Sequence, residues 1–364
     1  MAYSSLEIKG FDYVQHYVGN ARHSAYYYAR LYGFDIAGYM GPETGVRDRI
    51  SYLLTCNELM FAITSAIVPE HDIHNFVTRH GDGIREITFK VTDVYSAFEH
   101  AIAHGAEMYK KPYTDKDDQG TLVRGSVKIY GDTILTFVDR SKYSGLLPGY
   151  EPYEGPQMKL EDTGLVRIDH IVGNVEVGKM NFWAEFFEKT ADLETFIHFD
   201  KGDISTQYSS LVSKVVRSKN TAVRLPINEP AEGIKKSQIE EYLDVNYGAG
   251  VQHIAIETAD IVKTIRAMRA NGVEFIGTPQ TYYEVIGDRA HNIDEDIKEL
   301  AELDILLDRD EKGYLLQLFT QPVGDRPTLF YEIIERKGCD GFGQNNFQSL
   351  FESIEREQAR RGNL

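Results

Sequence analysis

The feature that constrains this chain most is an internal repeat. Two short segments match at an offset of 154 residues, VQHYVGN from Val14 and IDHIVGN from Ile168. A second pair matches without a gap at an offset of 167 residues, starting at Gly83 and Gly250. Each segment has the alternating pattern of a strand and leads into an amphipathic stretch typical of a helix. A duplicated strand–helix unit therefore organises the chain.

The later strands of each copy can also be followed. In the second pair the helices are predicted to end at Gly105 and Gly272, because glycine readily adopts the left-handed conformation of a helix C-terminus. Hairpin patterns follow over residues 127–137 and 305–319, and we interpret the two hairpins as equivalent. The repeating unit is therefore β-α-β-β-β, and its four copies begin near residues 12, 84, 166 and 251.

Four such units predict an α+β fold in two halves. The segment 143–164 contains SGLLPGYEPYEGP at its start and is interpreted as a linker between residues 1–142 and residues 165–345. The last unit is interrupted by an acidic insertion at 282–303, which is expected to be helical. A final amphipathic helix is predicted over residues 346–364.

Composition narrows the classes of partner and compartment. Lys and Arg total 39 against 56 Asp and Glu, so the net charge of −17 argues against nucleic acid and anionic membranes as partners. The two cysteines, Cys56 and Cys339, match neither a zinc site nor a disulfide framework, which favours the reducing cytoplasm. No apolar run approaches the ~18 residues of a membrane span.

Two histidines and one glutamate form a candidate metal site. The repeat places His170 and His253 at equivalent strand positions, so both side chains can face one cavity. Glu332 lies in LFYEIIE, a segment that alternates like the last strand of the fourth unit. Two histidines and one carboxylate are typical of non-haem Fe(II) oxygenases and leave three coordination positions open. A lone strand histidine is more often a core or surface residue, but the repeat favours ligands.

The first half differs at these positions. At the sequence offsets, His16 corresponds to His170 and Glu86 corresponds to His253, and no third ligand follows. We therefore expect a structural, metal-free N-terminal half and one metal ion per chain in the C-terminal half.

Seven segments occur in order at characteristic spacing: DHIVGN (169–174), RLPINEP (224–230), KSQI (236–239), GAGVQHIA (248–255), LLQLFT (315–320), PVGDRP (322–327) and GFGQNNF (341–347). In these segments the chain resembles the 4-hydroxyphenylpyruvate dioxygenases of the vicinal-oxygen-chelate superfamily. The resemblance covers nearly the whole chain. It implies two open β-barrels of two units each, with Fe(II) held in the C-terminal barrel by His170, His253 and Glu332.

The resemblance also implies a substrate pocket. Catalytic hydrogen bonds to substrate would come from Gln252, Asn228, Ser213 and Gln317. The other residues expected to contact substrate are Gln238, Pro226, Phe319, Phe330, Phe342, Asn346 and Phe347, with Phe319 and Phe347 flanking the aromatic ring. The Ser213 assignment depends on register, because SLVSKVVRS offers neighbouring serines. The final helix would act as a lid over the iron.

The implied reaction converts 4-hydroxyphenylpyruvate and O₂ to homogentisate and CO₂, a step of tyrosine and phenylalanine catabolism. The substrate carries its own 2-oxo acid, so no external 2-oxoglutarate is expected, and the implied assembly is a homodimer or homotetramer. Three alternatives remain at this point. They are a 4-hydroxymandelate synthase, an extradiol catechol dioxygenase, and a metal-free binding protein of the same superfamily.

Overall fold

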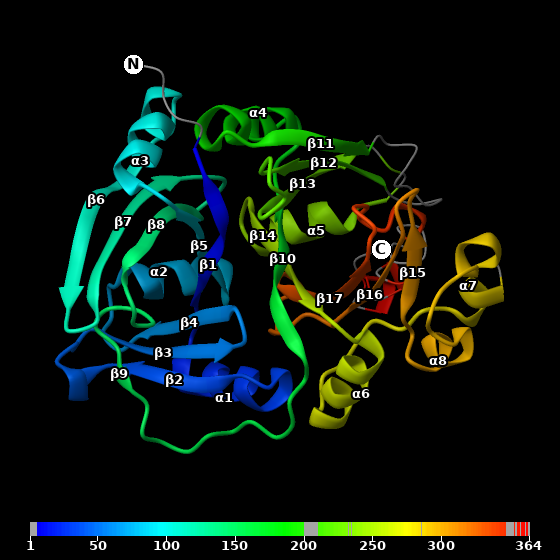
Figure 1. Ribbon diagram of the computed structural model, residues 1–364, viewed down its shortest axis with the longest axis horizontal. Helices are drawn as coiled ribbons and strands as arrows, with labels where there is room; N and C mark the ends of the chain where they lie inside the picture. Colours follow the sequence, from blue (N-terminus) through cyan, green and yellow to red (C-terminus); the bar gives the residue numbers. More distant parts are fainter. Residues whose placement is uncertain are drawn as a thin grey trace.

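The computed structural model describes residues 6–199, 210–231, 233, 235–284 and 286–346, with seven further residues between 353 and 362. Within this part of the chain the strands form two curled sheets that lie side by side (Figure 1). Phe347 and most of the predicted C-terminal helix lie outside the described residues, and those described at 353, 355, 356 and 358–360 are helical. Among the described residues, no helix has both the length and the apolar character needed to cross a membrane.

The first sheet has the strand order β6-β7-β8-β5-β1-β4-β3-β2-β9. Its strands are β1 (Ile8–Tyr17), β2 (Asp35–Met40), β3 (Arg49–Cys56), β4 (Leu59–Ala66), β5 (Gly83–Val91), β6 (Met108–Asp117), β7 (Gly120–Lys128), β8 (Ile134–Tyr143) and β9 (Glu151–Pro152). The helices of this half are α1 (Ala21–Tyr32), η1 (Pro42–Thr44), α2 (Asp72–His80) and α3 (Val94–Ala103).

The second sheet has the order β11-β12-β13-β10-β14-β17-β16-β15. Its strands are β10 (Leu165–Asn174), β11 (Glu194–Phe199), β12 (Ser210–Arg217), β13 (Arg224–Ala231), β14 (Gly250–Thr258), β15 (Leu306–Arg309), β16 (Tyr314–Phe319) and β17 (Phe330–Lys337). The helices are α4 (Met180–Ala191), α5 (Gln238–Val245), α6 (Ile261–Asn271), α7 (Gln280–Glu284), η2 (Gly287–Ala290), α8 (Ile297–Glu302) and η3 (Gln344–Asn346).

The predicted α+β architecture of four β-α-β-β-β units in two open barrels is confirmed. The units begin at β1, β5, β10 and β14, and the insertion before β15 is helical. Gly105 and Gly272 follow their helices with φ of +99° and +107°, as the left-handed helix end requires. Both predicted hairpins form, but they are not equivalent: β7 and β8 are the last two strands of their unit, whereas β15 and β16 precede the last strand of theirs.

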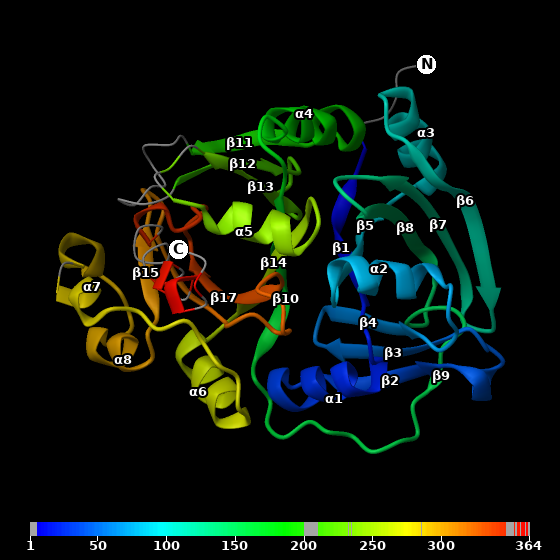
Figure 2. The same ribbon diagram turned by 180° about the vertical axis from the view of Figure 1, so that it is seen from behind.

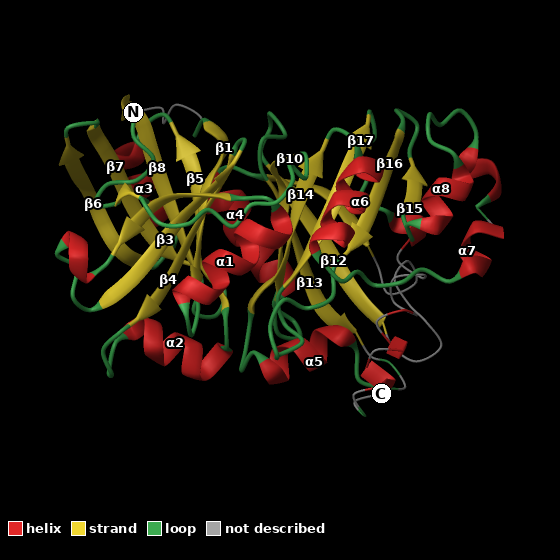
Figure 3. Ribbon diagram, turned by 90° about the horizontal axis from the view of Figure 1, so that it is seen from below, coloured by secondary structure: helices red, strands yellow, loops and turns green. Residues whose placement is uncertain are grey.

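The two halves meet through corresponding parts. Helix α3 packs against α4 and α1 packs against α6, so each contact joins a helix of one half to a helix of the other. Seen from below, the strands of the two halves lie next to each other (Figure 3). The strands β1 and β10, which open the two halves, both lie toward the middle of the molecule (Figure 2). One continuous hydrophobic core contains residues of both sheets.

Strand pairing corrects the offset of the first repeat. In the first sheet Val14 lies opposite Ile87, and in the second sheet Ile171 lies opposite Ile254. Because Ile87 and Ile254 are equivalent at the offset of 167, Ile171 corresponds to Val14. The true offset between β1 and β10 is therefore 157 residues, three more than the sequence match indicates.

The equivalent of His170 in the first sheet is thus Tyr13, and the pairing of His16 with His170 was wrong. The VGN residues that the two segments share occupy different structural positions in the two copies. Asn20 lies after β1 and caps α1 by accepting a hydrogen bond from the His23 backbone N–H, whereas Asn174 is still within β10. A similar motif therefore serves a helix start in one copy and a strand end in the other.

His16 instead belongs to the buried contact between the two halves. Its Nε2 lies 2.8 Å from the hydroxyl of Tyr331 on β17, and this hydroxyl also donates to Tyr28 on α1 at 3.0 Å. The rings of Phe61 and Tyr331 stack with centroids 6.1 Å apart. Burial lowers the pKa of His16 to about 3, so the imidazole is neutral in the folded protein.

This burial predicts an acid-sensitive fold. Since the unfolded chain binds a proton at His16 near the ordinary pKa of 6.5, stability is lost as the pH falls from about 6.5 toward 3. This one group contributes a slope of up to about 1.4 kcal/mol per pH unit. His16→Gln should therefore flatten the pH dependence of the free energy of unfolding between pH 4 and 7, measured by chemical denaturation. The exposed His23→Gln is the matched control, and an equal flattening there would contradict the assignment to His16.

Candidate metal centre

Three adjacent strands bring the predicted ligands together. His170 is on β10, His253 on β14 and Glu332 on β17, and Ala255 lies opposite both His170 and Glu332 in the strand register. The Nε2 atoms of His170 and His253 lie 3.2 Å and 3.3 Å from Oε2 of Glu332. The ligand atoms all lie within 4.8 Å of one another, and the three residues are buried. This arrangement is suited to one metal ion.

The charges of the three groups are coupled. Burial would raise the pKa of Glu332, but His170 and His253 outweigh it and hold this pKa at about 2. Burial lowers the pKa of His253. At His170 burial also acts to lower the pKa, but the nearby carboxylates of Glu332 and Asp169 have the larger effect and raise it. The site therefore keeps an ionised carboxylate in a buried position, where a bound cation would compensate its charge.

Each histidine ligand is held at its second nitrogen. Nδ1 of His170 lies 2.7 Å from Oδ2 of Asp169, and Nδ1 of His253 lies 2.9 Å from Oε1 of Gln252. Burial would raise the pKa of Asp169, but Arg336 and then His170 keep it well below its usual range. An ionised carboxylate only accepts hydrogen bonds, so Nδ1 of His170 carries the proton and Nε2 faces the metal position.

Gln317 and Phe319 on β16 share the face of the metal ligands. Phe319 lies directly opposite Glu332, and Gln317 lies opposite Ile334. The Gln317 side chain is 1% exposed, and neither its amide oxygen nor its amide nitrogen has a hydrogen-bond partner. A buried unpaired amide costs roughly 1–3 kcal/mol, so this side chain indicates a missing polar partner such as a ligand or water.

Aromatic rings pack against the two histidines. Phe330 stacks on His253 with ring centroids 4.8 Å apart and an angle of 22° between the planes. Phe342 meets His170 edge-on at 5.1 Å, and Phe319 meets His253 edge-on at 6.1 Å. The site thus has an apolar aromatic wall beside its charged ligands.

Ser213 and Asn228 are neighbours in the second sheet, and their contact with substrate stays a prediction. Ser213 on β12 lies directly opposite Asn228 on β13, and both side chains are buried. Asn228 donates a hydrogen bond to Oδ1 of Asn174 at 3.3 Å. Pro226 is two residues before Asn228 on the same strand and therefore shares its face of the sheet.

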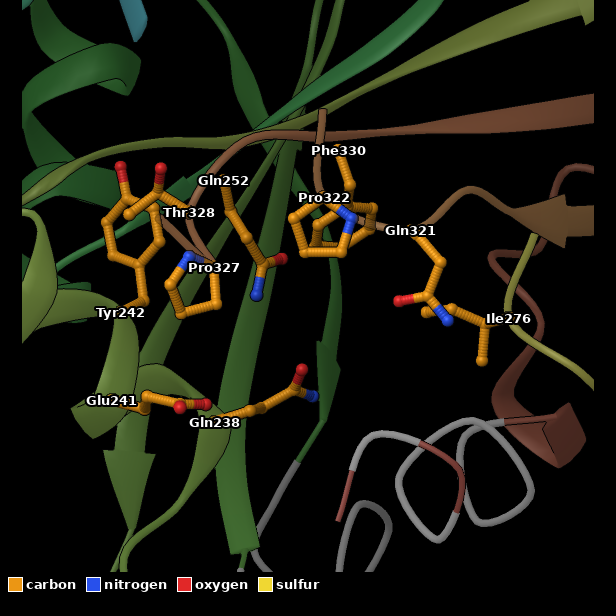
Figure 4. A pocket seen from close by; sticks show the side chains of 10 residues that line it. All are labelled: Gln238, Glu241, Tyr242, Gln252, Ile276, Gln321, Pro322, Pro327, Thr328 and Phe330. Atoms are coloured by element: carbon orange, nitrogen blue, oxygen red, sulfur yellow. The ribbon is translucent and has the colours of Figure 1, made fainter. Parts of the chain in front are cut away.

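A pocket contains two of the residues that contact His253, Gln252 and Phe330, and Figure 4 shows the side chains that line it. The amides of Gln238, from α5, and Gln252, from β14, point toward the same space. Phe330 connects this pocket to the metal centre, because it lines the pocket and stacks on His253. The remaining lining residues, which the sequence analysis did not single out, are Glu241, Tyr242, Ile276, Gln321, Pro322, Pro327 and Thr328. Glu241 could have been anticipated, since it lies three residues after Gln238 on a short helix.

Asn346 is not among the residues that line this pocket. Its side chain is buried and its Oδ1 accepts a hydrogen bond of 2.6 Å from Tyr282 of the insertion. Asn346 therefore joins the insertion to the segment after β17, and its contact with substrate stays a prediction. Phe347 lies outside the described residues.

The first barrel fills the equivalent site with its own side chains. Register places Tyr13, Glu86 and Thr136 where the second barrel has His170, His253 and Glu332. Tyr13 donates a hydrogen bond of 3.2 Å to Oε1 of Glu86, and Arg124 donates to the Tyr13 hydroxyl at 3.4 Å. Thr136 pairs with Ser126 at 2.7 Å. Among the described residues of this barrel there is no ligand set of the kind found in the second barrel.

Curated relatives match this chain along almost its whole length. A 4-hydroxyphenylpyruvate dioxygenase from Dictyostelium discoideum is 44% identical over 98% of this chain and 100% of its own sequence. The chain belongs to the 4-hydroxyphenylpyruvate dioxygenase family. A relative of the same name from Aspergillus fumigatus is also 44% identical, over 99% of this chain and 95% of its own.

A superfamily model and a solved structure also match most of this chain. The model of the glyoxalase/bleomycin resistance protein/dioxygenase superfamily matches residues 10–132 and 167–318. Among solved structures, a 4-hydroxymandelate synthase variant from Streptomyces coelicolor superposes with a TM-score of 0.86 at 31% identity, covering 96% of this chain and 99% of that one. The chain is thus a dioxygenase-family enzyme whose metal-binding triad is in the second barrel.

The ligand assignment predicts the effect of substitutions on metal binding. His253→Ala and Glu332→Gln should weaken the binding of a divalent metal ion by more than about 100-fold, since even changes outside the ligand shell cost 10–100-fold. Glu86→Gln, the matched change in the first barrel, should leave the content near one metal ion per chain. Metal analysis after dialysis measures both. Loss of half the metal in Glu86→Gln would show a second site in the first barrel.

Proposed function

We propose that this chain is an Fe(II) enzyme that converts 4-hydroxyphenylpyruvate and O₂ to homogentisate and CO₂. The observation that carries the proposal is the buried triad of His170, His253 and Glu332 beside the unpaired amide of Gln317. The relatives named 4-hydroxyphenylpyruvate dioxygenase support the substrate and the reaction. We also propose that residues 165–345 form the catalytic barrel and residues 1–142 a structural one.

The donor set supports iron. Two neutral imidazoles and one carboxylate suit Fe(II) and leave three positions for exogenous ligands. Bound Fe(II) would supply a positive centre for a 2-oxo acid and a site for O₂ activation. Because the substrate brings its own 2-oxo acid group, no external 2-oxoglutarate is needed.

The protein's own residues would orient the substrate. Phe319, Phe330 and Phe342 surround the histidines and offer apolar area to a phenyl ring. The side chains of Ser213, Asn228, Gln238, Gln252 and Gln317 are neutral, so they can bind a phenol or carboxylate without competing with the metal for charge. Holding the ring and the 2-oxo acid in one fixed relation is what decarboxylation followed by ring hydroxylation requires.

The environment would also exclude water. The three ligands and Gln317 are all buried, and Phe319, Phe330 and Phe342 pack against the two histidines. Exclusion of water strengthens the electrostatic interactions of the bound groups and keeps reactive intermediates from side reactions. We propose that residues 346–364 contribute to this cover as a lid.

One alternative has a specific observation in its favour. The superposition on a 4-hydroxymandelate synthase variant shows that the same scaffold serves an enzyme of another name. The curated relatives at 44% identity favour the dioxygenase instead, and they also weigh against an extradiol catechol dioxygenase or a metal-free binding protein.

A direct assay separates these functions. The purified chain, loaded with Fe(II), is mixed with 4-hydroxyphenylpyruvate while O₂ uptake is recorded, and the products are identified by chromatography. We expect O₂ consumption with homogentisate as the main product. Hydroxymandelate as the main product would establish the synthase, and turnover of catechols alone would establish an extradiol enzyme.

Removing the Phe319 ring should uncouple decarboxylation from ring hydroxylation. Phe319→Ala leaves the metal ligands and the 2-oxo acid site intact but loosens the ring, so decarboxylation should outrun hydroxylation. We expect the CO₂ released to exceed the homogentisate formed, with both measured in the same reaction. Phe182→Ala changes an exposed phenylalanine on α4 and serves as the control. Equal yields of CO₂ and homogentisate in Phe319→Ala would remove this residue from ring placement.

A further inference from the structure

The second nitrogens of the two histidine ligands face different chemical groups. Nδ1 of His253 meets the neutral amide of Gln252, whereas Nδ1 of His170 meets the carboxylate of Asp169. A carboxylate behind a ligating imidazole fixes the ring orientation and raises its basicity. The two ligands are therefore held unequally.

Asp169 is itself fixed on three sides. Arg336 on β17 donates from Nε to Oδ1 at 2.7 Å and from Nη2 to Oδ2 at 2.8 Å, and Arg224 on β13 donates to Oδ1 at 3.2 Å. The Asp169 side chain is fully buried. The carboxylate of Asp169 therefore accepts hydrogen bonds from two guanidinium groups in addition to its contact with His170.

The first barrel contains the same pair without a metal ligand. At the corrected offset Asp12 corresponds to Asp169, and Arg140 donates from Nε to Oδ1 of Asp12 at 2.5 Å. The likeness extends to the backbone, since Nη1 of Arg140 donates to the carbonyl of Gly145 and Nη1 of Arg336 to that of Gly341, each five residues on. An aspartate–arginine pair between the first and last strands thus belongs to the barrel fold itself.

The two pairs differ in the partners of the carboxylate. Oδ1 of Asp169 also accepts from Arg224, whereas Nζ of Lys90 lies 4.0 Å from Oδ1 of Asp12. Oδ2 of Asp12 is buried without a hydrogen-bond partner, whereas Oδ2 of Asp169 accepts from both His170 and Arg336. The residue next to Asp12 is Tyr13, which takes the place of His170 and hydrogen-bonds to Glu86 instead. The second barrel therefore uses an oxygen that the fold alone leaves free.

We propose that Asp169 is a positioning residue for the metal, because its carboxylate fixes the imidazole of His170 through Nδ1 and is itself fixed by Arg336 and Arg224. The inference rests on the proposed metal-dependent function. Asp169 does not touch the metal, so its effect passes through the orientation and basicity of one ligand.

The test compares the two barrels with Co(II) as the probe. Asp169→Asn removes the charge at constant size, Asp169→Glu keeps the charge but displaces the carboxylate, and Asp12→Asn is the matched control. Co(II) affinity is measured by competition with a coloured chelator, the geometry by the visible absorption of the Co(II) protein, and stability by Tm. We expect both Asp169 variants to bind Co(II) 10–100-fold more weakly with shifted absorption bands. Asp12→Asn should lower Tm alone.

The outcomes separate this inference from the proposed function. If the parent chain fails to bind Co(II), the metal-dependent function itself is wrong. If the parent binds Co(II) and either folded Asp169 variant binds it with unchanged affinity and spectrum, the positioning role is overturned and the pair is structural in both barrels. Asp169→Glu keeps the ion pair, so the test stands even where Asp169→Asn lowers Tm below the assay temperature.

Discussion

The alternation of side chains along β17 joins the metal centre to the rest of the molecule. Tyr331 points from one face of the strand to His16 and Tyr28 of the first half, and Glu332 points from the other face to the two histidine ligands. A slip of one residue in the pairing of β17 would exchange these faces and place a tyrosine among the ligands. The contact between the barrels and the ligand geometry therefore depend on one strand register.

Charge is balanced around the centre in layers. Glu332 carries a negative charge among the ligands, and behind it Asp169 is matched by Arg336 and Arg224. Arg336 also lies over the ring of Phe342 at 5.3 Å, and Phe342 in turn packs on His170. One guanidinium group thus supports both an outer carboxylate and a wall of the pocket, which makes arginine hard to replace by lysine at this position.

Much of the architecture could be predicted from the sequence, because the repeat is visible in hydrophobic periodicity and in turn glycines. The unit order, the helical insertion and the three ligands followed from that pattern. The offset of the first repeat could not be predicted correctly from the sequence. The matching motif contains Asn20, which caps a helix, and Asn174, which ends a strand, so the two asparagines are not structurally equivalent. The contact of Asp169 with Arg336 was also missed, because the two residues are 167 positions apart in the chain and only the folded sheet brings them together.

The register shifts in β1 and β10 fall at equivalent positions, so the internal repeat is preserved in the strand pairing of these two strands. The connections after the first strands have changed length, but the hydrogen-bond ladders have kept the positions of the two barrels in correspondence. This correspondence between the barrels identifies the positions at which a second metal centre could be engineered in the same chain. Its ligands would belong at Tyr13, Glu86 and Thr136, with Asp12 already standing behind the first of them. His16 would be the wrong position for a ligand, although the sequence motif aligns it with His170.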